Sequence, residues 1–135
     1  MRISGSDRLC VILLDVNNLK QINDTLGHEK GDELITIVGR NVLTLTDVNK
    51  KGYRIGGDEF VIIVENPQEG EVDDLLQKWE ELVAMKSKTD TTVLSVAVGY
   101  ACGEGKNIDK IIKEADQLMY QKKNEQKTAG WNKPE

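Results

Sequence analysis

The sequence predicts an α+β fold, in which a four-stranded antiparallel sheet of ferredoxin-like or polymerase-palm type carries its helices on one face. Three observations lead to this prediction: a continuous apolar run, two apolar runs joined by a Gly-Gly step, and apolar residues at helical spacing elsewhere. They give the element order β-α-α-β-β-α-β-α. The 135 residues fit a single domain over 1–135, with a loose tail from about 125 to 135.

The first strand and the next two helices are predicted from the N-terminal third. "LCVILLDV" (9–16) is apolar at almost every position, the pattern of a central strand that is buried on both faces. "NNLKQINDTLG" is typical of a short helix, with Asn17 or Asn18 as its cap and Gly27 as its stop. Asp32 can then cap a longer helix. Apolar residues recur along that helix at Ile35, Val38, Val42 and Leu45.

A hairpin, a helix, a strand and a final helix follow. The hairpin has arms at 52–55 and 60–64, because its Gly-Gly step reaches the positive φ angles of tight turns without steric cost. A helix is predicted after Pro67, and "TTVLSVAVGYA" (91–101) is a strand rich in β-branched residues. The last helix begins at Asn107 as its cap. The apolar positions of the two helices are Leu75, Leu76, Trp79, Leu82 and Val83, then Ile108, Ile111, Ile112, Ala115 and Met119.

Charge and composition exclude several classes of function. The net charge of −5 argues against non-specific binding to nucleic acid or to an anionic membrane, both of which require a basic face. No apolar run reaches the roughly 20 residues of a membrane span, and the start "MRISGSDR" lacks a signal-peptide core. Cys10 and Cys102 lie in or beside predicted strands, so we expect buried free thiols and a reducing cytoplasm.

Two carboxylates stand at the ends of predicted strands. Asp15 closes the buried first strand, and Asp58 sits at the hairpin tip; in a ferredoxin-like sheet these positions can be neighbours. Two neighbouring carboxylates repel unless a cation lies between them, and oxygen ligands suit Mg²⁺. Such a site would serve phosphoryl or nucleotidyl transfer. The alternative is structural: Asp15 caps the next helix, and Asp58 is a solvated turn residue.

Three blocks of the sequence resemble the GGDEF family, the bacterial diguanylate cyclases. The five-residue signature of the family stands intact at 56–60, within "RIGGDEFVIIV". The upstream block "LDVNNLKQINDTLGHEKGDELI" matches the family's first motif, and "EADQLMYQKK" resembles its last. The blocks occur in the family's order and cover residues 9 to about 127, nearly the whole chain.

The resemblance implies a metal site and a nucleotide site. By position, Asp15 and Asp58 would hold Mg²⁺ or Mn²⁺, two ions per active site, with the Val16 carbonyl as a further ligand. Glu59 matches the fourth signature residue and completes the implied catalytic set with these two carboxylates. The implied substrate-binding residues are Asn23 and Asp32 for guanine, Lys20, Lys123 and Lys127 for phosphate, and Gly56 and Gly57 at the hairpin tip.

Several of these residues also have a plain structural interpretation. Asn23 can simply end a helix, and Lys20 and Lys123 can lie on solvated helix faces. For Asp32 the chemistry fits, because a carboxylate accepts from guanine N1–H and the exocyclic amine, which adenine cannot offer together. His28 is the only histidine and suggests a general base, but it matches a structural loop position in the family, so we expect no catalytic role.

The implied reaction condenses two GTP to cyclic di-GMP and two pyrophosphates. Because one domain holds one GTP, the implied partners are GTP and a second GGDEF domain in a transient homodimer, with a sensory domain in the full-length protein. No contact with nucleic acid or membrane is expected. Two alternatives stay open: a GTP-binding regulatory module with little or no turnover, and a pure interaction domain of a signalling protein.

The chain departs from the family at four places. The inhibitory "RxxD" motif reads Asp47-Val48-Asn49-Lys50, so we expect no allosteric inhibitory site. The family's "GRN" reads "QKT", in which Lys127 keeps the charge but not the bidentate phosphate contact of arginine. The "T-x-S-x-G" strand begins with Ser95, which we expect to alter only packing. The family's "DxLT" segment is expected to be absent, because eight residues precede Leu9.

Overall fold

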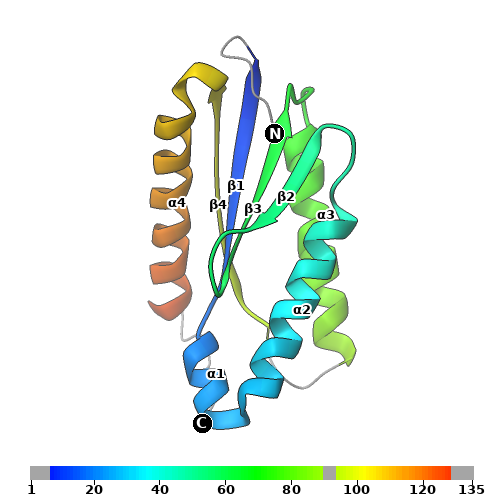
Figure 1. Ribbon diagram of the computed structural model, residues 1–135, viewed down its shortest axis with the longest axis vertical. Coiled ribbons are helices and arrows are strands. Elements are labelled where there is room, and N and C mark those ends of the chain that lie inside the picture. Colours follow the sequence, from blue (N-terminus) through cyan, green and yellow to red (C-terminus); the bar gives the residue numbers. More distant parts are fainter. Residues whose placement is uncertain (1–6, 90–93, 129–135) are drawn as a thin grey trace.

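The computed structural model describes residues 7–89 and 94–128, which form an antiparallel sheet flanked by helices (Figure 1). The elements are β1 (Arg8–Val16), α1 (Leu19–Leu26), α2 (His28–Thr44), β2 (Lys50–Arg54), β3 (Glu59–Glu65), α3 (Glu71–Thr89), β4 (Val96–Glu104), the 3-10 helix η1 (Gly105–Asn107) and α4 (Ile108–Thr128). The predicted α+β class and element order are confirmed.

The sheet has the strand order β2-β3-β1-β4, and every neighbouring pair is antiparallel. This is the order of a ferredoxin-like sheet. The central position of β1 follows from its sequence, because the side chains of residues 9–14 are all buried, which only a strand covered on both faces allows. The register pairs Asp15 at the end of β1 with Glu59 at the start of β3.

The helices cover both faces of the sheet, so the prediction that they share one face is wrong. Figure 1 shows α4 alone on one side of the sheet, with α2 and α3 on the other. Ile12 and Leu14 of β1 belong to the cluster with α2 and α3, whereas Val11 and Leu13 pack against α4. A strand that is apolar at every position presents apolar side chains to both faces, and each face requires its own cover.

The ends of α1 and α2 differ from the predicted capping. Asn18 is the N-cap of α1, but it has a left-handed φ of 57° and its side chain makes no capping hydrogen bond. Gly27, at φ 93°, ends α1 and is also the N-cap of α2. Asp32 therefore lies inside α2, where its side chain is exposed, and does not cap it. The Asp32 carboxylate is therefore not used to cap the helix.

Two segments end later in the chain than predicted. The last strand runs from 96 to 104 rather than from 91 to 101, and residues 91–93 lie outside the described part. Helix α4 continues to Thr128, so 125–128 are helical and not a loose tail; residues 129–135 lie outside the described part. In the described residues, no helix has both the length and the apolar character that crossing a membrane requires.

Cys10 and Cys102 form a disulfide, which contradicts the expected free thiols. The two residues are directly paired between β1 and β4. Side chains at such a pair lie on the same face with their Cβ atoms within about 4.5–5.5 Å. The sequence separation of 92 residues hid this pairing, which only the strand register makes visible.

Helix α4 lies unusually close to β4. A Cβ atom on Gly99 would overlap backbone atoms of Ala115 and Met119. Backbone atoms cannot move aside as a flexible side chain can, so only glycine fits at this point of the strand. This close approach fixes the helix that carries Lys123 against the sheet that carries Asp15.

Candidate active site

Three acidic residues meet where β1 and the β2–β3 hairpin end. Asp15 and Glu59 are a directly opposed pair, so their side chains share one face of the sheet. The backbone N–H of Val16 donates to the carbonyl of Asp58 at 2.9 Å, which fixes the hairpin tip beside the end of β1. The expected proximity of Asp15 and Asp58 is therefore what the strand register produces.

The hairpin tip is held in shape by its own backbone and by Arg54. The N–H of Ile55 donates to the Glu59 carbonyl at 2.9 Å. The Arg54 guanidinium donates to the carbonyls of Gly56 at 3.0 Å and Gly57 at 2.6 Å. A Cβ on Gly57 would meet no atom within 4 Å, so this side of the tip is open to a ligand. Sequence reasoning missed the role of Arg54 in bracing this turn.

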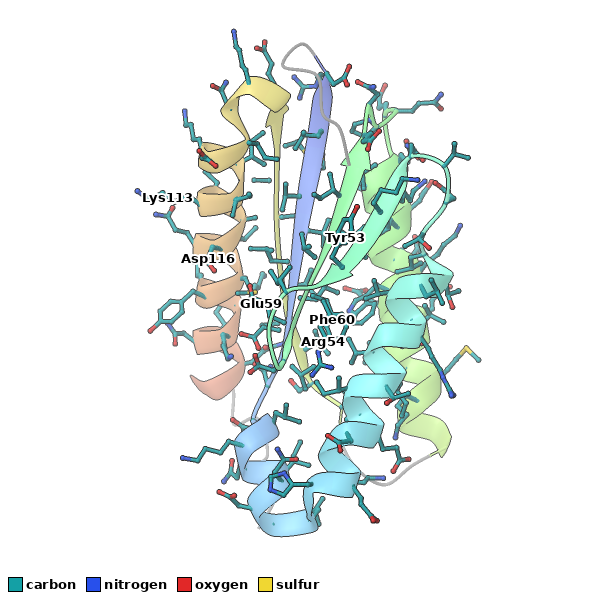
Figure 2. The ribbon with its side chains drawn as sticks, viewed as in Figure 1. Tyr53, Arg54, Glu59, Phe60, Lys113 and Asp116 are labelled. Carbon is teal, nitrogen blue, oxygen red and sulfur yellow. A yellow bond between two sulfur atoms is a disulfide. The ribbon has the colours of Figure 1, made fainter. Side chains whose placement is uncertain are left out.

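Burial and neighbouring carboxylates raise the pKa values of Asp15 and Glu59. Burial raises the pKa of Asp15, Lys123 lowers it through a hydrogen bond and its charge, and Asp58 raises it again; the balance lies above the usual value. The pKa of Glu59 is also raised, first by burial and then by Asp15, Asp116 and Asp58. Figure 2 shows Glu59 on the side of the sheet that α4 covers, with Asp116 on that helix. Unbalanced negative charge is therefore concentrated here.

Asp15 has one paired oxygen and one unpaired oxygen. Its Oδ2 accepts from Lys123 Nζ at 2.9 Å, and the exposed fractions of these side chains are 13% and 25%. Its Oδ1 is buried without a hydrogen-bond partner in the described part of the chain. A buried carboxylate oxygen without a partner is costly, and a hard cation would satisfy it. Lys123, a predicted phosphate ligand, is therefore paired with Asp15, a predicted metal ligand.

The donor set fits a magnesium ion. Asp15 and Asp58 supply carboxylates, and the Val16 backbone lies beside them. No group of three or more His, Cys, Asp or Glu side chains among the described residues is arranged as metal ligands, so Glu59 is not brought in as a third. Mg²⁺ commonly takes only one or two protein carboxylates and fills its other positions with water and phosphate oxygens.

The predicted guanine-reading residues lie at the corner between α1 and α2. Asn23 faces Gly31, where a Cβ atom would overlap its Oδ1, so glycine makes room for the amide. That Oδ1 is buried and has no hydrogen-bond partner in the described residues. Asp32 follows Gly31 directly, and its side chain is exposed. An unpaired amide oxygen near an exposed carboxylate suits a ligand that donates several hydrogen bonds.

The remaining predicted lysines lie on α1 and α4. Lys20 is exposed on α1. Lys127 follows Lys123 by four residues on α4. These positions are compatible with phosphate binding, which stays a prediction for both.

Sequence reasoning missed a polar network that joins the ends of three elements. Asn17 is 5% exposed and donates from Nδ2 to Ser95 Oγ at 2.8 Å and to Gln126 Oε1 at 2.7 Å. Gln126 donates in turn to the Val96 carbonyl at 3.3 Å. The network connects β1, β4 and α4 two residues from Asp15 and three from Lys123. An asparagine directly after an almost wholly apolar strand was the signal available in the sequence.

The segment matching the inhibitory motif takes part in an internal ion-pair network. Lys50 Nζ donates to Glu71 Oε2 at 2.6 Å and to Asp47 Oδ2 at 3.1 Å. Asn49 Nδ2 donates to the same Glu71 oxygen at 3.1 Å. Hydrogen bonds from Lys50, the Gln68 backbone and Asn49 lower the pKa of Glu71 to about 2. The absence of an allosteric site here stays a prediction.

We expect this network to make stability depend on pH in acid. A carboxyl whose pKa is lower in the folded chain stabilises the fold above its unfolded pKa, and this contribution is lost as pH falls through the folded pKa. At pH 7, Glu71→Gln should lower the free energy of unfolding by about 1–2 kcal/mol. The difference from wild type should shrink between the usual glutamate range and the folded pKa of about 2.

Urea unfolding at a series of pH values measures this difference. The control is Glu69→Gln, which removes an exposed carboxylate two residues away. A constant difference between wild type and Glu71→Gln across the acid range would show that the ion pairs do not stabilise the fold.

Comparison with known proteins places this geometry in context. The family model described as "Diguanylate cyclase, GGDEF domain" matches residues 2–129. The cyclic di-GMP phosphodiesterase NbdA of Pseudomonas aeruginosa is 31% identical over 119 residues, which are 85% of this chain and 15% of NbdA. The probable diguanylate cyclase DgcF of Escherichia coli is 32% identical over 134 residues, 90% of this chain and 41% of DgcF.

A solved structure agrees with the fold. The GGDEF domain of DgcB from Caulobacter crescentus, crystallised with c-di-GMP, superposes with a TM-score of 0.78 at 25% identity and covers 90% of this chain and 75% of that one. The curated relatives are much longer than the matched segment, since the chain spans less than half of each. What those whole proteins do is therefore not transferred with the fold.

Proposed function

The chain belongs to the diguanylate cyclase GGDEF-domain family, and from that premise we propose that it is a diguanylate cyclase catalytic domain. It would condense two GTP to cyclic di-GMP with release of two pyrophosphates. The observation that carries the proposal is the meeting of Asp15 and Asp58 beside an intact signature, where a buried carboxylate oxygen has no partner among the described residues.

The residues present would divide the work of this reaction. Asp15 and Asp58, with the Val16 carbonyl, would hold two Mg²⁺ or Mn²⁺ ions, which would activate the attacking 3′-hydroxyl and stabilise the leaving pyrophosphate. Glu59 would keep the negative charge of the site high. Asn23 and Asp32 would orient the guanine.

The phosphates would be bound mainly by lysines. Lys20, Lys123 and Lys127 would neutralise the triphosphate, with the open side of Gly57 leaving space at the hairpin tip. Neither of the two required nucleotides can be attacked by its own 3′-hydroxyl in this scheme. A second GGDEF domain must therefore present the other GTP, and a sensory domain would control that encounter. We place the activity in the cytoplasm, where GTP is available.

A regulatory GTP-binding module is the second candidate. One relative that shares this segment, NbdA, is named a phosphodiesterase. In this chain Lys123 is paired with Asp15, and Lys127 replaces the arginine of the family's "GRN" motif. Such a module would bind GTP without making product.

Product formation at several protein concentrations tests the proposal. The chain is incubated with GTP and Mg²⁺, and cyclic di-GMP is quantified by chromatography. Specific activity should rise with protein concentration across a roughly hundredfold dilution series, because the productive encounter joins two domains. Binding of labelled GTP without product would instead support the regulatory module. A flat series with substantial activity would contradict an encounter between two separate chains.

A further inference from the structure

The ion pair between Lys123 and Asp15 joins two residues that would bind different ligands in the proposed function. Lys123 Nζ lies 2.9 Å from Asp15 Oδ2, and both side chains are mostly buried. Asp15 would bind a metal ion, whereas Lys123 would bind phosphate. With this pair intact, a divalent ion on Asp15 Oδ1 would lie beside the ammonium group on Oδ2, and the two positive charges would repel each other.

The surrounding charges show why a cation lies there. Asp58, Glu59 and Asp116 all act on the same acidic cluster as Asp15, and Lys123 is the group that lowers the pKa values of Asp15 and Glu59. A cluster of carboxylates with no metal needs a counter-ion. Lysine suits this task, because its ammonium is a compact charge on a flexible four-carbon stem.

The helix that carries this lysine is held in place. Gln126 bonds to Asn17 and to the Val96 carbonyl, and Gly99 allows α4 to approach β4 closely. The ammonium group can therefore change partners by rotation of its own side chain, while the helix backbone stays on the sheet.

We propose that Lys123 is an exchangeable counter-ion, which pairs with Asp15 Oδ2 when no metal is bound and transfers to the triphosphate when metal and nucleotide bind. This inference rests on the proposed function. A divalent ion arriving alone must displace Lys123 from Asp15 without giving it a new anionic partner. A nucleotide supplies that partner, so nucleotide and metal each strengthen the binding of the other through this side chain.

Mn²⁺ binding without nucleotide tests the proposal. The free Mn²⁺ signal in electron paramagnetic resonance gives the affinity of wild type, Lys123→Gln and Lys122→Gln. The last is a matched control, because Lys122 is the neighbouring lysine on α4, is 53% exposed and pairs with Glu125. We expect Lys123→Gln to bind Mn²⁺ at least about fivefold more tightly than wild type, and Lys122→Gln to stay within about twofold.

A non-hydrolysable GTP analogue provides the second half of the test. It should raise the Mn²⁺ affinity of wild type by a larger factor than that of Lys123→Gln, in which no lysine remains to be displaced. Equal or weaker Mn²⁺ binding by Lys123→Gln, or an equal gain in Lys122→Gln, would overturn the proposal.

Folding of the variant is a further readout. Lys123→Gln leaves Asp15 without its counter-ion, so Mn²⁺ should raise the Tm of this variant more than that of wild type. If the variant is unfolded without metal, Mn²⁺ should restore its folded circular dichroism spectrum, and a failure to do so would overturn the exchange.

The outcomes separate this inference from the proposed function. A wild type that makes no cyclic di-GMP, combined with tighter Mn²⁺ binding by Lys123→Gln, would refute the cyclase and leave the exchange supported. Absence of Mn²⁺ binding in wild type and variant, with and without the analogue, would overturn both.

Discussion

Asp58→Asn should lower cyclic di-GMP production by at least about a thousandfold while leaving the fold intact. An amide cannot supply the negative charge that would hold a divalent ion beside Asp15. The fold should survive, because Asp58 contributes to the β1–β3 junction through its backbone carbonyl, which the substitution retains. The measurement is initial rate at saturating GTP and Mg²⁺, with urea unfolding as the check on folding.

Asp109→Asn is the matched control for this variant. It makes the same chemical change at an exposed position in the first turn of α4, remote from the hairpin tip. Its rate should equal that of wild type. Retention of the wild-type rate by Asp58→Asn at saturating Mg²⁺ would show that the metal assignment is wrong.

The second large effect concerns the base. Asn23→Ala and Asp32→Ala should each weaken GTP binding by about 1–3 kcal/mol, the cost of losing a hydrogen bond that a buried polar group needs. Both should narrow the preference for GTP over ATP, since the lost partners are groups that adenine does not present. Titration with fluorescent analogues of the two nucleotides gives both affinities for each variant.

Asp24→Ala separates base recognition from general charge effects. This residue is exposed on α1 next to Asn23, and it has no assigned part in the site. It should leave both affinities unchanged. Equal losses of GTP and ATP affinity in Asn23→Ala and Asp32→Ala would show that these side chains do not read the base.

Local patterns predicted the first strand and the hairpin correctly, because their signals lie within short segments. The apolar run of β1 identified the central strand, and the Gly-Gly step identified the turn that carries Asp58. Adjacency of the two carboxylates then followed from strand order. The same run also indicates helices on both faces, because its odd and its even positions are both apolar.

Long-range polar contacts were not predictable in the same way. The hydrogen bond between Asn17 and Gln126 joins residues 109 positions apart in the sequence. No local pattern around Gln126 indicates which residue it would contact. The Cys10–Cys102 pair depends on the β1–β4 register, which side-chain patterns alone do not fix. Lys123 was identified by resemblance as a phosphate ligand, and its contact with Asp15 emerges only when α4 lies on the sheet.

The contact between Asp15 and Lys123 also has a consequence for biosynthesis. The two residues are 108 positions apart, so the first acidic residue of the site leaves the ribosome long before its counter-ion. The central strand β1 likewise cannot complete its pairing until β4, the second of its two sheet neighbours in chain order, has been made. Contacts of such long sequence separation form late and slowly. A nascent or truncated chain that stops before α4 therefore has no assembled centre, and nucleotide binding would report that synthesis of this domain is complete.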